Sequence, residues 1–174
     1  VLKKVSLIAC EDTRVTKKLL KKYEISNKTI SFFNHNAKDR IPKILEELKQ
    51  QKSIALVSDA GLPSISDPGE YLINEAKNND LQVICIPGPC AALTALVSSG
   101  FSSSSFVFEG FLPRVKTERK KILEEIKLRS RTTIIYESPY RIINLLRELE
   151  DLCGGTRKIV LFREMTKLYE EHIG

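Results

Sequence analysis

The stretch LVSDAGLPSISDPG, residues 56–69, starts as an apolar strand and then changes character abruptly. The twelve residues after Val57 include three Ser, two Asp, two Gly and two Pro, although the whole chain has only eight Gly and seven Pro. Small residues at Ser58, Ala60 and Gly61 would let a ligand approach the backbone. Ligands of open α/β sheets bind just outside the carboxyl ends of strands. The stretch therefore predicts an α/β fold with a ligand site where this strand ends.

The composition limits the classes of protein that the chain can represent. Its 174 residues are 42% hydrophobic, enough for one large or two small domains, and contain no apolar run near the ~18–20 residues that span a bilayer. The net charge of +6 favours an anionic partner such as nucleic acid. Four cysteines without a C-x-x-C pair and only two histidines predict reduced thiols, no metal site and a cytoplasmic protein.

Short apolar runs alternate with apolar residues at helical spacing, and this alternation predicts the α/β class. Apolar residues recur at helical spacing over 41–48 and 142–149. The pairs Asp67-Pro68 and Ser138-Pro139 predict helix starts, and Gly154 predicts a helix end. The strands are expected at 5–9, 54–57, 82–86, 106–109, 132–136 and 158–162.

A serine-rich segment at 98–105 divides these signals into two sets. Short polar residues of this kind suit a domain boundary, so we expect domains at 1–101 and 102–174. A loop within one domain is the alternative.

Polar residues follow all six expected strands, as in Glu11-Asp12-Thr13-Arg14 after the first and Glu137-Ser138 after the fifth. Turns favour such residues for local reasons, but six polar strand ends in one chain favour a binding site. The pattern after Val57 is neither the dinucleotide-binding G-x-G-x-x-G nor the phosphate-binding G-x-x-x-x-G-K-[ST].

Seven blocks in one order carry a family resemblance. They are ACEDTRVTKKLL (9–20), FFNHN (32–36), LVSDAGLPSISDPG (56–69), PGPCAALTAL (87–96), FEGFLPR (108–114), YESPYR (136–141) and REMTKLYEE (163–171). Over essentially its whole length the chain resembles the ribosomal RNA small subunit methyltransferase I family, a branch of the tetrapyrrole methylase superfamily.

The resemblance implies two α/β domains with S-adenosylmethionine in the cleft between them, and a homodimer. It implies methylation of a cytidine ribose 2′-hydroxyl in the decoding region of 16S rRNA, free or in the small ribosomal subunit. The family's opening strand and Pro/Gly turn, and part of its last domain, have no counterpart here, so we expect a chain truncated at both ends. The alternatives are a carbon methylase of tetrapyrrole precursors and a non-catalytic RNA-binding module.

The resemblance also assigns residues to roles. For the cofactor it implies contacts from Ser58, Asp59, Ala60, Gly61, Pro89, Cys90, Ala91, Ala92, Leu112 and Pro113. The candidate catalytic residues are Asp12, Arg14, His35 and Glu137, with Glu11 as a further proton acceptor. The candidate RNA contacts are Arg114, Lys116, Arg119, Lys120, Lys121 and Arg141.

Local alternatives stand beside these roles. Asp12 or Thr13 could simply cap a helix with Arg14 solvated, and His35 could belong to a turn. The basic residues from Arg114 onward could form an ordinary solvated helix face.

Overall fold

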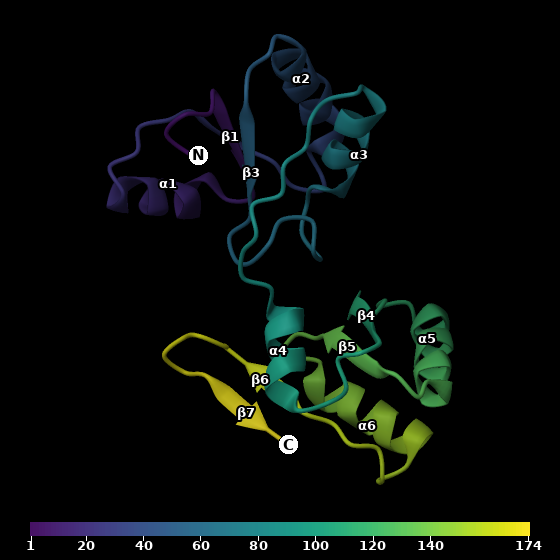
Figure 1. The fold of residues 1–174 in the computed structure, drawn as a ribbon. Coiled ribbons are helices and arrows are strands. Elements are labelled where there is room, and N and C mark those ends of the chain that lie inside the picture. The colour runs from purple at the N-terminus through teal and green to yellow at the C-terminus, as the bar shows by residue number, and fades with distance from the viewer. The chain divides into compact units, whose positions relative to one another are not determined.

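The computed structural model describes residues 1–174, which form two compact units, Val1–Pro89 and Cys90–Gly174 (Figure 1). Both units combine helices with parallel strands, as the α/β prediction requires. The boundary expected at 101/102 follows a helix of the second unit, and it stays a prediction about the family's domains. No helix in the chain is long and apolar enough to cross a bilayer.

The first unit is organised around a three-stranded parallel sheet with strand order β2-β1-β3. Its strands are β1 (Leu7–Cys10), β2 (Thr29–Ser31) and β3 (Ile54–Val57). In the register of the sheet, Cys10 lies beside Ser31 on one side and beside Val57 on the other. All three strands therefore end at the same edge.

Helices cover both faces of this sheet because successive strand residues point to opposite sides. The helices are α1 (Thr13–Lys22), α2 (Ala37–Lys49) and α3 (Glu70–Asn78). Helices α2 and α3 lie side by side on one face, and α1 lies on the other (Figure 1). The core of the α2 and α3 face consists of Ala9, Phe32, Ala37, Ile44 and Leu72, all buried.

The second unit contains a parallel strand pair, β4 (Phe106–Phe111) and β5 (Thr132–Tyr136). Its helices are α4 (Ala91–Ser99), α5 (Lys116–Leu128) and α6 (Ile142–Cys153). A separate antiparallel pair, β6 (Leu161–Arg163) and β7 (Glu171–Ile173), ends the chain.

Two apolar clusters hold the second unit together. Ala92 and Leu96 of α4 pack with Ile134 of β5. Leu123 and Ile126 of α5 pack with Leu145 of α6 and with Leu112, which follows β4; all four are buried. Helix α4 therefore packs on β5 in the first cluster, while α5 and α6 pack against each other in the second.

The strands expected at 54–57 and 132–136 are confirmed to the residue, and those at 5–9 and 106–109 form with small shifts. The strand expected at 158–162 is confirmed only in part, as β6 begins at Leu161. The strand expected at 82–86 is wrong: this segment has no strand partner, and Ile84 and Ile86 are exposed. An apolar pattern predicts that a segment can be buried, but it does not supply a neighbouring strand.

The helices expected to start at Asp67-Pro68 and Ser138-Pro139 form, but they begin a few residues later, although the Ser138 carbonyl already accepts from the Ile142 N–H at 3.1 Å. Helix α3 begins at Glu70 after Gly69, and α6 begins at Ile142 after Arg141; neither start has a side-chain cap. Turns fill the residues in between, because Asp-Pro and Ser-Pro serve turn initiation as well as helix capping. The expected end at Gly154 is confirmed: its φ is +72°, and its N–H donates to the Glu150 carbonyl at 2.9 Å.

Gly69 is the glycine whose position in the first unit is most constrained. Its φ is +147°, and a Cβ there would collide with the Ser64 hydroxyl and lie 2.8 Å from Leu56 Cδ2. We expect Gly69→Ala to lower the free energy of unfolding by about 2–4 kcal/mol, from backbone strain and overpacking together. Urea unfolding followed by circular dichroism measures the loss. The matched control is Gly88→Ala, where the nearest atom is 4.0 Å away; equal stabilities of the two variants would contradict the expectation.

Candidate functional site

The edge where the strands of the first unit end brings two acidic residues together. Asp12 follows β1 and Asp59 follows β3, and the Asp12 backbone N–H donates to Asp59 Oδ1 at 3.3 Å. This contact spans 47 positions of sequence and follows from the parallel register of the two strands. The polar segments that follow β1 and β3 therefore meet at one edge.

Asp12 caps helix α1 and binds Arg14. Its Oδ1 accepts from the Arg14 backbone N–H at 2.7 Å, and its Oδ2 pairs with Arg14 Nη2 at 2.7 Å. These hydrogen bonds and the guanidinium charge lower the pKa of Asp12 from 3.8 to about 2. The local alternative for this segment, a capped helix start, is therefore what the structure contains. A carboxylate with so low a pKa is a weak proton acceptor.

The pKa values of two other carboxyl groups at this edge are raised, in contrast to that of Asp12. Burial raises the pKa of Glu11, and the charges of Asp67 and Asp59 raise it further. Burial likewise raises the pKa of Asp67. Glu11 is thus a stronger base than its neighbour Asp12.

The turn after β3 is small and open. The Ser58 hydroxyl donates to the Gly61 carbonyl at 3.0 Å, and Gly61 adopts a φ of +87°. A Cβ built at Gly61 would lie 3.6 Å from the Pro89 carbonyl oxygen, so this turn adjoins the segment that ends the first unit. Asp59 and Ala60 are exposed. The turn can admit a ligand to its backbone and offer it the Asp59 carboxylate.

His35 lies in an exposed turn after β2, at the same edge of the sheet. Asn36 shapes this turn: its Oδ1 accepts from the Phe33 N–H at 2.9 Å, and its Nδ2 donates to the Ser31 carbonyl at 3.1 Å. The His35 ring packs edge-on against Phe33, with the centroids 6.4 Å apart. The imidazole is thus available to a ligand while the turn itself is held by its neighbour.

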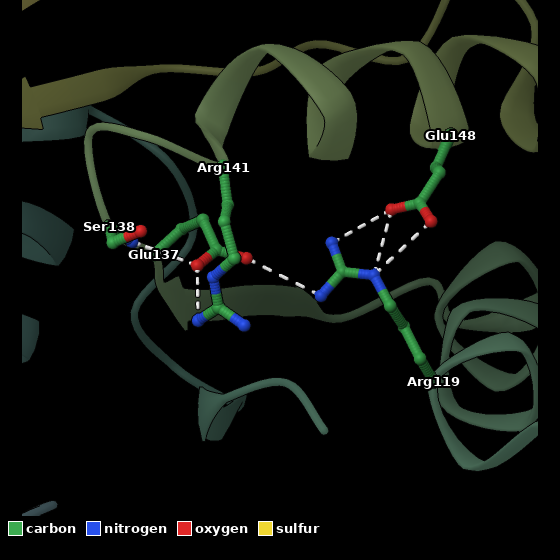
Figure 2. Close-up of polar contacts among 5 residues, drawn as sticks. All are labelled: Arg119, Glu137, Ser138, Arg141 and Glu148. Atoms are coloured by element: carbon green, nitrogen blue, oxygen red, sulfur yellow. Dashed lines mark hydrogen bonds and ion pairs between the residues drawn. The ribbon is translucent and has the colours of Figure 1, made fainter. Parts of the chain in front are cut away.

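In the second unit, Glu137 is buried among cations at the end of β5 (Figure 2). Its side chain is 2% exposed. One oxygen, Oε1, pairs with Arg141 Nη2 at 2.6 Å and accepts from the Ser138 N–H at 2.8 Å, while Oε2 pairs with Arg119 Nη1 at 3.4 Å. Both oxygens are therefore occupied by internal partners, which leaves little capacity to accept a substrate proton.

Arg119 links α5 to both Glu137 and α6 (Figure 2). Its Nη2 lies 2.7 Å from Glu148 Oε2, and its side chain is 11% exposed. The hydrogen bonding of the Arg119 guanidinium, which donates to the Glu148 carboxylate, is the largest influence that raises the pKa of Arg119. This arginine therefore differs from the other basic residues predicted around it, which are exposed: Arg114, Lys116, Lys120 and Lys121.

The predicted cofactor residues of the second unit lie at the start of α4 and after β4. The Ala92 N–H, in the first turn of α4, donates to the Tyr136 hydroxyl at 3.0 Å. The Tyr136 ring packs edge-on against Phe108 and Phe111, with centroids 4.9 and 5.6 Å away. Leu112 has only 2% of its surface exposed and packs in the core, so any contact it makes with a ligand would come from its backbone.

Sequence reasoning missed Tyr136, Ser138 and Glu148 as parts of these arrangements. Tyr136 and Ser138 lie within the YESPYR block, next to residues that were singled out. Glu148 gave no signal, because one glutamate in a charged helix resembles any other. No group of three or more His, Cys, Asp or Glu side chains is placed to hold a metal ion, and all four cysteines are free, with Cys10 buried and Cys85 exposed.

Comparison with known proteins identifies the family of the chain. The sequence profile described as Tetrapyrrole (Corrin/Porphyrin) Methylases matches residues 1–174. The chain belongs to the tetrapyrrole methylase family. Within the family it is similar to proteins named Ribosomal RNA small subunit methyltransferase I.

Three such relatives show the extent of the similarity. The protein from Vibrio cholerae is 49% identical over 98% of this chain, and that from Bacillus subtilis is 48% identical over 99% of it. The one from Thermotoga maritima is 45% identical over 98% of this chain and is covered over 76% of its own length. The chain spans 59% of the length of the first two relatives.

The low pKa of Asp12 leads to a prediction about pH. Asp12 lends α1 stability that is complete above the unfolded-chain pKa of 3.8 and is lost as the pH falls towards about 2. We expect Asp12→Asn, which keeps a capping oxygen but loses the charge, to melt below the wild type at pH 7. The difference in Tm should hold down to about pH 5 and narrow below pH 4. A difference that is unchanged at pH 3 would contradict this account.

Proposed function

We propose that the protein containing this chain transfers a methyl group from S-adenosylmethionine to the ribose 2′-hydroxyl of a cytidine in the decoding region of 16S rRNA. The observation that carries the proposal is that relatives 45–49% identical over 98% of this chain are named Ribosomal RNA small subunit methyltransferase I. The net charge of +6 and the exposed basic residues before and within α5 agree with an RNA substrate. A cytoplasmic location and a homodimer belong to the same proposal.

The turn after β3 fits S-adenosylmethionine in its chemistry. When bound, this cofactor supplies a methyl group on a positively charged sulfur. The exposed Asp59 carboxylate can accept hydrogen bonds from a ribose diol or pair with the methionyl ammonium group, and Ala60 and Gly61 leave the backbone accessible. In the second unit, the start of α4 offers backbone N–H groups at Cys90 and Ala91, next to the Ala92 N–H that donates to the Tyr136 hydroxyl.

A ribose 2′-hydroxyl is a poor acid, so its attack benefits from a proton acceptor and from nearby cations. Among the predicted acidic candidates, Asp12 has a pKa of about 2 and Glu137 is occupied by two arginines. Glu11, whose pKa is raised, and the exposed His35 are better suited to accept the proton. We therefore assign Asp12 to holding Arg14, and Glu11 or His35 to the proton.

The substrate contacts are assigned to exposed cations. Arg114 and Lys116 precede and begin α5, and Lys120 and Lys121 lie within it. Phosphate groups bind such side chains without reading sequence. Arg119 is assigned an internal role, because its guanidinium already binds two carboxylates.

Methyl transfer from labelled S-adenosylmethionine tests the proposal. Full-length protein is incubated with small ribosomal subunits, or with free 16S rRNA, that lack the modification. We expect label on a ribose of the RNA. Label on a base, label only in a corrin or porphyrin precursor, or RNA binding without cofactor uptake would each overturn it in favour of another activity.

Two single variants separate the cofactor contacts from the RNA contacts. Asp59→Ala should weaken S-adenosylmethionine binding by roughly 10-fold or more, since a hydrogen bond to a charged group contributes about 1.5–3 kcal/mol. Lys120→Ala removes an exposed side chain and should weaken RNA binding several-fold, with cofactor binding unchanged. Calorimetry with the cofactor and a filter-binding assay with RNA measure the two effects. Equal effects of both variants on both ligands would show that the roles are misassigned.

A further inference from the structure

Arg141 is held on one side only. Its Nη2 pairs with Glu137 Oε1 at 2.6 Å, and no other ion pair or side-chain hydrogen bond holds its guanidinium. Its side chain is 29% exposed, whereas that of Glu137 is 2% exposed. One nitrogen of a planar group with five N–H donors is therefore paired with a buried carboxylate, and the remaining donors are open to another acceptor.

Glu137 is itself fixed in place from three directions (Figure 2). It accepts from the Ser138 N–H, pairs with Arg119 and pairs with Arg141. Arg119 shares its charge with Glu148 at 2.7 Å, so the charge of Glu137 is left mainly to Arg141. The carboxylate cannot turn away from Arg141 without losing its other partners.

We propose that Glu137 is a positioning residue that aims the guanidinium of Arg141 at an RNA phosphate. The inference deepens the proposed function and depends on it, since the phosphate is that of the RNA substrate. A guanidinium binds phosphate best with two parallel N–H donors, and holding it beforehand removes the cost of ordering a long side chain. Glu137 thus contributes to RNA binding through Arg141, without touching the RNA or accepting its proton.

RNA affinity measured against salt concentration tests this role in the full-length protein. The probe is a 16S decoding-region hairpin, with an unrelated RNA of equal length beside it. Removing one phosphate contact should reduce the slope of log K against log salt by about 0.7–0.9. We expect this reduction for Arg141→Ala, with affinity about 5–10-fold weaker, and most of it for Glu137→Gln.

A double variant and a matched control separate positioning from general stability. Glu137→Gln combined with Arg141→Ala should bind RNA no more weakly than Arg141→Ala alone, because the first residue acts through the second. The control is Glu148→Gln, which removes the outer partner of Arg119 and leaves the pair of Glu137 and Arg141 in place; it should keep the wild-type affinity and slope. Additive losses, or an unchanged slope in Arg141→Ala, would overturn the inference.

Arg141→Lys provides the test if Glu137→Gln does not fold. Lysine keeps the charge but lacks the planar fork that binds a carboxylate and a phosphate together, so its affinity should remain near that of Arg141→Ala. Wild-type affinity in Arg141→Lys would show that charge alone suffices and that positioning plays no part. If the wild type methylates a ribose of the RNA but these variants bind RNA as the wild type does, only this inference is refuted. If the variants bind RNA more weakly but the wild type methylates no ribose, only the proposed function is refuted.

Discussion

Parallel pairing of β1 with its two neighbours is the constraint on which the candidate site depends. Three strands that run the same way must end at one edge, so the residues after them become neighbours whatever their separation in sequence. The hydrogen bond from the Asp12 N–H to Asp59 at 3.3 Å is the direct result. An antiparallel pairing of the same segments would place these residues at opposite ends of the sheet.

Two adjacent residues at the end of β5 have different partners. Tyr136 is the last residue of the strand, and Glu137 follows it. Tyr136 accepts a hydrogen bond from the first turn of α4, while Glu137 pairs with Arg119 and Arg141. The adjacent residues Tyr136 and Glu137 thus contact two different groups. Tyr136 contacts α4, whose start is predicted to bind the cofactor, and Glu137 contacts arginines predicted to bind RNA.

The basic residues of α5 have two different roles, although they look alike in sequence: some form internal ion pairs and others are exposed to solvent. Arg119 and Lys120 are adjacent in α5, yet Arg119 is nearly buried between two carboxylates and Lys120 is 73% exposed. Burial makes Arg119 an internal ion-pair partner, whereas Lys120, whose 3.8 Å ion pair with Glu124 is exposed, stays accessible to phosphate. The count of 28 Lys and Arg residues therefore overstates the cations that an RNA could reach.

Local apolar patterns, turn chemistry and ordered motifs are enough to predict the α/β class, the strands at 54–57 and 132–136, the glycine stop of α6 and the family. They also predict a polar edge after the strands. Three features emerge only in the folded chain: residues 82–86 lack a strand partner, Arg14 holds Asp12, and Glu137 is buried between two arginines. These outcomes depend on which residues distant in sequence come into contact, and local sequence patterns do not predict the free energy of such contacts.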